Sequence, residues 1–158
     1  MKKPLKILLG GVPFGRNNVG DEAILECTVK IIRGICPEAQ ITVSTDDGPA
    51  TEAKLKVRTV ELFGFAPPFS RRLMRQTIEA HDVFIWAGAT GLSDYPEVPI
   101  EMLQIARNTG RTTVVWGVGM NHHLNPFLYS YSIEKRRMLQ LLSACTLNQI
   151  NLVKSIEK

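Results

Sequence analysis

The feature that most constrains this fold is an apolar strand that runs into a glycine-rich turn and then into an acidic helix start. Residues 5–10 are mostly apolar, and four glycines follow between residues 10 and 20. Glycines let such a turn bring bare backbone N–H groups to a helix N-terminus, where they can hold a phosphate, a carboxylate or a sugar hydroxyl. The helix predicted over residues 21–35 opens with Asp21 and Glu22, whose charges compete with a bound anion for the helix dipole. Hydroxyl recognition or base chemistry is therefore an alternative to phosphate binding.

Strand and helix patterns alternate along the rest of the chain. Residues 82–87 and 112–117 are continuous apolar runs with β-branched and aromatic residues, typical of parallel strands buried on both faces. Further strands are predicted at 40–45, 57–62 and 144–147, and further helices at 70–80, 99–108, 128–143 and 150–156. This alternation predicts an α/β fold, a Rossmann-like doubly wound parallel sheet, as a single domain over residues 1–158. Its ligands would bind outside the carboxyl ends of the strands.

Two helices have a predicted orientation. In helix 21–35 an apolar stripe at helical spacing is expected to face the core, with Cys27 as a buried small residue. In helix 70–80 three arginines are expected on a solvated outer side. The stripe consists of Ile24, Cys27, Thr28, Ile31 and Ile35, and the arginines are Arg71, Arg72 and Arg75.

Composition excludes several classes of protein. The chain has 158 residues, of which 44% are hydrophobic and 22% charged, as expected of one soluble globular domain. A net charge of +4 without a dense Lys/Arg block argues against a nucleic-acid surface, and no apolar run is long enough to span a membrane. The three cysteines have no CxxC spacing, which fits reduced thiols in the cytoplasm better than disulfides or a zinc site. We therefore expect a cytoplasmic protein with no metal and no nucleic-acid partner.

Three loops rich in glycine and polar residues follow predicted strands, at 10–20, 87–97 and 117–125. In a doubly wound sheet such loops converge on one crevice at the carboxyl edge. The residues expected to line this crevice are Gly15, Asn17, Asn18, Asp21, Gly88, Thr90, Gly119 and Asn121.

The first loop resembles a known family motif. Residues 14–25, FGRNNVGDEAIL, are similar to the opening Gly-x-x-Asn-x-Gly-Asp-Glu-Ala-Ile/Leu turn of the polysaccharide pyruvyl transferase family. The second loop resembles the family's Gly-Gly-Gly-Ser-Leu-x-x-Asp segment at Gly88, Thr90 and Asp94, and residues 116–119 resemble its next glycine strand end. The resemblance covers most of the chain, but only about the N-terminal half of a family member.

The resemblance implies a function and partners. Family members have two Rossmann-like domains of the glycosyltransferase-B type, of which this chain would be the first, with the C-terminal domain absent. They transfer a pyruvyl group from phosphoenolpyruvate, a donor substrate and not a cofactor, to a sugar of a cell-surface polysaccharide. The implied partners are a saccharide acceptor, free or lipid-linked, the missing domain, and a second copy of the chain in a homo-oligomer. Because the donor-binding residues would lie in the missing domain, the isolated chain is expected to be inactive.

By analogy with the glycosyltransferase-B type, this half would hold the acceptor. Asp21 is the first candidate to contact an acceptor hydroxyl or act as a general base, although a helix N-terminus lowers a carboxylate pKa. The alternative is that Asp21 only caps and charges the first helical turn. His122 is the second catalytic candidate. The substrate-binding candidates are Gly15, Asn17, Asn18, Gly20, Glu22, Gly88, Thr90, Asp94, Gly119 and Asn121.

Departures from the family pattern keep other hypotheses open. Ala87 and Ala89 stand where two of the triple glycines are usual, and Asn148 and Gln149 replace a usual Arg-Asp pair. The chain could therefore be an inactive paralogue, or a nucleotide- or sugar-binding module without catalysis.

The main rival by fold is a dinucleotide site. Asp46 or Asp47 after the second strand would suit a ribose, but the Gly-x-Gly-x-x-Gly motif is missing.

Overall fold

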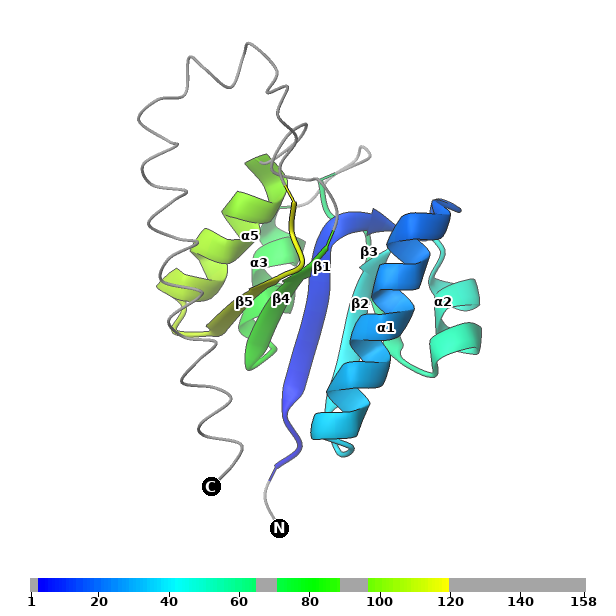
Figure 1. Cartoon of the computed structure of the whole chain (residues 1–158). Coiled ribbons are helices and arrows are strands. Elements are labelled where there is room, and N and C mark those ends of the chain that lie inside the picture. Colours follow the sequence, from blue (N-terminus) through cyan, green and yellow to red (C-terminus); the bar gives the residue numbers. More distant parts are fainter. Residues whose placement is uncertain (1–2, 65–70, 89–96, 120–158) are drawn as a thin grey trace.

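A computed structural model describes residues 3–64, 71–88 and 97–119 (Figure 1). Five parallel strands form one sheet in the order β3-β2-β1-β4-β5. The strands are β1 (Lys6–Phe14), β2 (Gln40–Thr45), β3 (Arg58–Glu61), β4 (Val83–Ala87) and β5 (Thr112–Trp116). The helices are α1 (Val19–Ile35), α2 (Gly48–Leu55), α3 (Arg71–Glu79) and α5 (Glu97–Asn108). The predicted Rossmann-like α/β sheet is confirmed over these residues.

The helices form two neighbouring pairs, on opposite faces of the sheet (Figure 1). An ion pair of 3.2 Å between Lys54 and Glu26 joins α2 to α1, and one of 3.1 Å between Arg71 and Glu101 joins α3 to α5. From β1 the chain moves outward through β2 to β3, then returns to the other side of β1 as β4. The strand order therefore reverses between β1 and β4, the place where ligands bind in open α/β sheets.

The first strand is longer than predicted. It was expected to end at Gly10, but it runs to Phe14, with a register irregularity against β2 between Leu9 and Phe14. Gly11 absorbs this irregularity with a φ of +82°, and a Cβ there would lie 2.6 Å from Cδ1 of Trp86. The first glycines thus serve strand packing, and the turn begins at Gly15.

The predicted orientation of α1 is confirmed at Thr28 but wrong at Cys27, Ile31 and Ile35. Its buried residues are Leu25, Thr28, Val29 and Ile32, whereas Ile31 is 40% exposed, Ile35 is 54% exposed and Cys27 is also exposed. The helix carries two overlapping apolar stripes about one position apart. Contact with the sheet selects the second, and helical periodicity alone does not separate them.

The remaining boundaries show smaller differences. The strand predicted at 40–45 is confirmed, and α1 begins at Val19 because Asn18 is its N-cap. Helix α2 was not predicted; Asp47 caps it, since the Asp47 side chain accepts a hydrogen bond of 3.0 Å from the Ala50 N–H. The elements predicted at 128–143, 144–147 and 150–156 lie outside the described residues.

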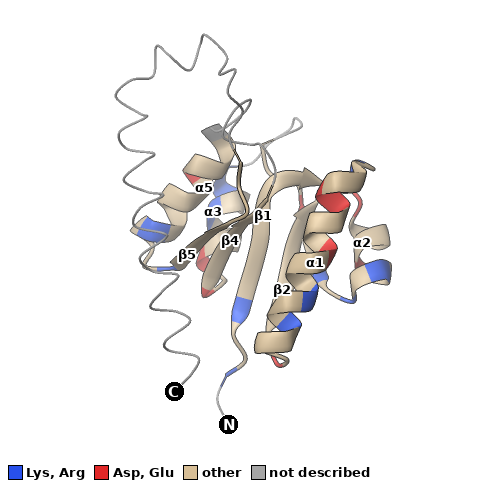
Figure 2. Cartoon of the chain, viewed as in Figure 1, with Lys and Arg blue, Asp and Glu red and all other residues tan. Residues whose placement is uncertain are grey.

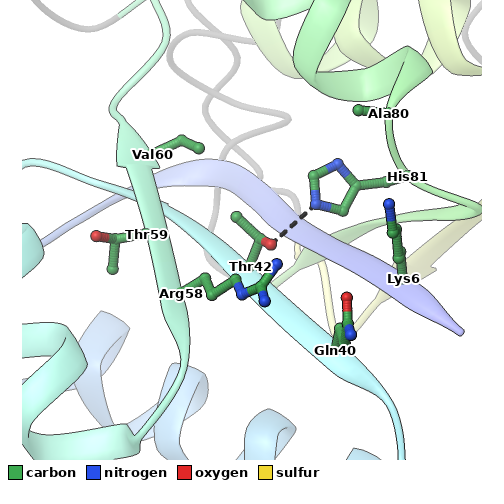
Figure 3. Close-up of a pocket in the computed structure, with 8 residues that line it drawn as sticks. All are labelled: Lys6, Gln40, Thr42, Arg58, Thr59, Val60, Ala80 and His81. Atoms are coloured by element: carbon green, nitrogen blue, oxygen red, sulfur yellow. Dashed lines mark hydrogen bonds between the residues drawn. The ribbon is translucent and has the colours of Figure 1, made fainter. Parts of the chain in front are cut away.

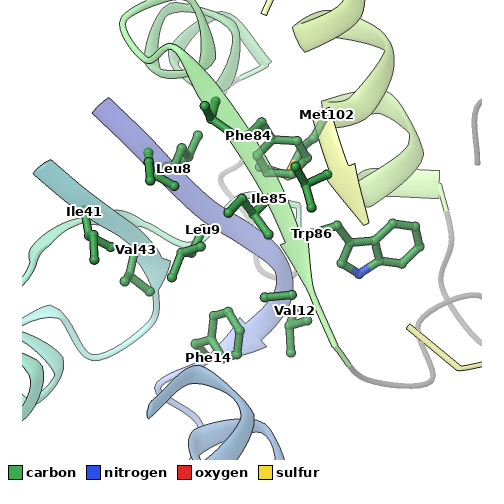
Figure 4. Packing of buried hydrophobic residues seen from close by; sticks show 14 of the residues in the cluster. Leu8, Leu9, Val12, Phe14, Ile41, Val43, Phe84, Ile85, Trp86 and Met102 are labelled. Carbon is green, nitrogen blue, oxygen red and sulfur yellow. The ribbon is translucent and has the colours of Figure 1, made fainter. Parts of the chain in front are cut away.

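The core lies on both faces of β1 and β4 (Figure 4). Strand β4 is buried along its whole length, as predicted, but Trp116 at the end of β5 is 41% exposed. Strand β5 is an edge strand of the described sheet, which explains its partial burial. The predicted solvated face of α3 is confirmed at Arg71, Arg72 and Arg75. Within the described ranges, no helix has the length and apolarity needed to cross a membrane.

Candidate functional site

The candidate site is the carboxyl edge of the sheet around the ends of β1 and β4. Since all five strands are parallel, the segments after β1, β4 and β5 emerge at the same edge. The described candidates that follow these strand ends are Gly15, Asn17, Asn18, Gly20, Asp21, Glu22, Gly88 and Gly119. Thr90, Asp94, Asn121 and His122 lie outside the described residues.

The loop after β1 is held by the helix that follows it. The Gly15 N–H donates to Oε1 of Glu22 at 2.8 Å, so this carboxylate reaches back over the turn. The Asn18 side chain accepts from the Gly20 N–H at 3.1 Å, and the Asn18 carbonyl accepts from the Glu22 N–H at 3.0 Å. Asn18 is therefore the helix cap, so the alternative is wrong in making Asp21 the cap, although Asp21 does place its charge in the first turn. Asn17 has a left-handed φ of 60° and is exposed.

The loop after β2 lies against the same turn. Nε of Arg16 pairs with Oδ2 of Asp46 at 3.2 Å, and the Asp46 N–H donates to the Phe14 carbonyl at 2.9 Å. Both side chains of the pair stay partly exposed, at 38% and 49%. These contacts, and the capping of α2 by Asp47, occupy the two carboxylates that a dinucleotide site would offer to a ribose.

Sequence reasoning missed Arg16, which places a cation at the candidate site. The usable signal was its position between Gly15 and Asn17 in the turn that resembles the family motif.

The segment after β4 begins at Gly88, which packs closely against α1. Gly88 is buried with a φ of +86°, its N–H donates to the Trp116 carbonyl at 2.7 Å, and a Cβ there would lie 2.5 Å from Cγ2 of Ile24. Asp21 precedes Ile24 by three residues and so lies on the same side of α1. The Asp21 side chain is thus placed on the side of the helix that meets the β4 end.

The Asp21 carboxylate is partly buried at this edge. Among the described residues, none forms a hydrogen bond or an ion pair with it. Figure 2 shows acidic residues on the first turns of α1. Asp21 is therefore a carboxylate at the strand reversal whose hydrogen-bonding capacity is not used by the described part of the chain.

Comparison with protein families identifies the chain's relatives. Residues 18–149 match the sequence model of the family described as polysaccharide pyruvyl transferase. The chain belongs to this family. Among curated proteins, none gives a significant match. The matched range contains Asp21, Glu22 and Gly88. It therefore includes most of the described candidate site of this member of the pyruvyl transferase family.

The environment of Asp21 raises its pKa above the ordinary value, contrary to the expectation of a lowered one. Burial is the larger cause, because it disfavours the charged form, and the negative charge of Glu22 adds to it. A carboxylate with a raised pKa is a better proton acceptor once it is ionised.

This raised pKa predicts a stability effect. Asp21→Asn should increase the free energy of unfolding at neutral pH by less than about 1 kcal/mol, because water screens a partly exposed charge. The folded chain keeps the Asp21 proton to a higher pH than the unfolded chain does. Asp21 therefore destabilises the folded chain increasingly as the pH rises above 3.8, the ordinary pKa of this group. The gain from Asn should therefore shrink as pH falls toward 3.8.

Urea unfolding of both proteins at several pH values measures this. Glu38→Gln, at an exposed acid before β2, is the control and should change stability little at neutral pH. A gain for Asp21→Asn that grows toward low pH would contradict the assignment.

Proposed function

We propose that this chain is the acceptor-binding domain of a polysaccharide pyruvyl transferase with a glycosyltransferase-B arrangement of two domains. The second domain would supply the residues that bind phosphoenolpyruvate, and the reaction would take place in the cytoplasm. Family membership and the parallel sheet support this proposal.

The proposed reaction gives Asp21 a chemical role. Forming a ketal breaks the bond between C2 of phosphoenolpyruvate and its phosphate oxygen and joins C2 to two sugar oxygens. The two sugar hydroxyls lose their protons, one proton converts the C3 methylene to a methyl group, and the other balances the released phosphate. Asp21 would accept a hydrogen bond, and then a proton, from one of these hydroxyls. The partly buried carboxylate without a described partner, at the strand reversal, is the observation that carries this role.

The other candidates complete the proposed site. Asn17 is exposed in the turn before α1 and would contact a second sugar hydroxyl, and Arg16 would orient a polar group of the acceptor. Asn18 and Glu22 would act by holding the loop, as their hydrogen bonds to Gly20 and Gly15 indicate.

Saccharide binding tests the proposal. The chain would be titrated with a panel of hexoses and N-acetylhexosamines that carry neighbouring hydroxyls, with the amide resonances of Asn17 and Gly88 followed by NMR. Asp21→Asn should weaken binding at least about tenfold, because a hydrogen bond to a charged group contributes about 1.5–3 kcal/mol.

Glu38→Gln removes an acid near the opposite edge and should leave saccharide affinity unchanged. Equal affinity of the wild-type chain and Asp21→Asn would remove Asp21 from the proposed site. Stronger binding of anions after this substitution would instead mean that Asp21 only opposes a phosphate.

A binding module without catalysis is the second candidate. It is favoured by Ala87, which stands at the β4 end where family members usually have glycine. The affinity of the chain for NAD distinguishes a nucleotide-binding module from the proposed transferase domain. Tight NAD binding that improves in Asp21→Asn and is lost in Asp46→Ala would replace the transferase proposal.

A further inference from the structure

A hollow with charged and polar side chains in its lining lies toward the opposite, amino edge of the sheet (Figure 3). Its cavity volume is about 230 Å³. Lys6 comes from the start of β1, Gln40 and Thr42 from β2, Arg58 from the start of β3, and His81 from the segment between α3 and β4. Because Lys6, Gln40, Arg58 and His81 begin or precede their strands, these side chains lie toward the amino edge, away from the candidate site at the carboxyl edge.

The hollow carries uncompensated positive charge. Within the described part of the chain, neither Lys6 nor Arg58 has a carboxylate within 4.0 Å of its charged nitrogens. The neighbouring acid, Asp82, accepts a hydrogen bond of 2.9 Å from the backbone N–H of Lys6 and not from its ammonium group. In Figure 3 the side chains of Lys6 and Arg58 lie on either side of Thr42 and Gln40.

Hydrogen bonds determine the proton positions on His81. Nδ1 lies 2.7 Å from the Thr77 carbonyl oxygen, which can only accept, so Nδ1 carries a proton. Nε2 lies 2.9 Å from Oγ1 of the buried Thr42. In neutral His81, Nε2 must therefore accept the hydroxyl proton of Thr42. In protonated His81, Nε2 donates instead, and the Thr42 hydroxyl proton becomes available to another acceptor.

We propose that this hollow binds a phosphate-type oxyanion, held by Lys6, Arg58 and the Thr42 hydroxyl. Lys6 and Arg58 supply the charge, and the Gln40 amide supplies a neutral donor. Protonation of His81 both adds a positive charge and turns the Thr42 hydroxyl toward the anion. Oxyanion binding and protonation of His81 thus favour each other.

The electrostatics of His81 agree with this coupling. Its pKa is lowered, first by burial and further by the charges of Lys6 and Arg58, while the Thr77 carbonyl and Asp82 act in the opposite direction. An anion between the two cations would offset their effect and raise the pKa of His81. By linkage, the anion must then bind more tightly at lower pH.

The test is an NMR titration of the His81 ring in the full chain, with its resonances assigned by their loss in His81→Gln. Inorganic phosphate is expected to raise the pKa of His81 by about half a unit to one unit with saturation, equivalent to about three- to tenfold tighter binding to the protonated form. Sodium chloride at the same ionic strength should produce a much smaller shift. A sugar phosphate used in place of inorganic phosphate shows whether a free ion or a phosphate monoester is the better ligand.

Variants separate the site from general surface charge. Arg58→Gln, at an exposed position, should weaken phosphate binding at least fivefold. Arg107→Gln, exposed in the last turn of α5, should leave phosphate binding unchanged. Thr42→Val should reduce the dependence of phosphate affinity on pH, with folding checked by circular dichroism. Equal shifts of the His81 pKa with chloride and phosphate would overturn the proposal. Equal losses of phosphate affinity in Arg58→Gln and Arg107→Gln would also overturn it. None of these results depends on the saccharide site.

Discussion

Replacing Gly15 by alanine is expected to lower the free energy of unfolding by about 3 kcal/mol. Two costs combine at this position. The φ of Gly15 is +82°, a conformation that costs an L-residue about 1–2 kcal/mol, and a Cβ would lie 2.4 Å from both the Asp47 backbone nitrogen and Oγ1 of Thr45. Because one of these atoms is backbone, relief requires the loops after β1 and β2 to separate. Disturbing these loops would also weaken the Arg16–Asp46 pair.

Two other glycines provide matched controls for Gly15→Ala. Gly110 has a φ of +72° but nothing within 4 Å of an added Cβ, so Gly110→Ala should cost only the conformational part, about 1 kcal/mol. Gly34 lies in α1 with open space around it, so Gly34→Ala should stabilise by up to about 1 kcal/mol. Chemical denaturation of the three variants measures this order. Similar losses for Gly15→Ala and Gly110→Ala would show that the two loops are not packed as described.

Leu9→Ala is expected to lower the free energy of unfolding by about 3–4 kcal/mol. Leu9 is fully buried in β1 and is paired in register with Val43 on β2 and with Ile85 on β4. Shortening its isobutyl side chain to a methyl group leaves a cavity at the centre of the sheet, where strands on both sides prevent collapse. Thermal and urea unfolding followed by circular dichroism measure the loss.

Leu73→Ala is the control, because it makes the same substitution on α3 where Leu73 is 41% exposed. Its expected cost is below about 1 kcal/mol. If Leu73→Ala destabilised the chain as much as Leu9→Ala, the assignment of β1 as the centre of the core would be wrong.

Much of the candidate site was predictable because parallel strands place all their carboxyl ends at one edge. Gly15, Asp21 and Gly88 could thus be assigned to this edge from strand order in the sequence alone. Their partners could not be assigned, since the contact of Gly88 with Ile24 and the Arg16–Asp46 pair join segments far apart in the chain. The direction of the Asp21 pKa shift was also predicted wrongly, because the sequence reveals the position of Asp21 in the helix but not its burial.

The sequence by itself determined the alternation of strands and helices, the parallel sheet and the family resemblance, since these depend on local periodicity and on a contiguous motif. Only the tertiary structure decided which stripe of α1 is buried, because two overlapping stripes satisfy the same helical period and contact with the sheet selects one. It also decided that Gly10 and Gly11 belong to β1, because the packing of Trp86 against Gly11 is a long-range contact. The hollow around His81 likewise required the tertiary fold, since it unites the starts of three strands with the segment before a fourth.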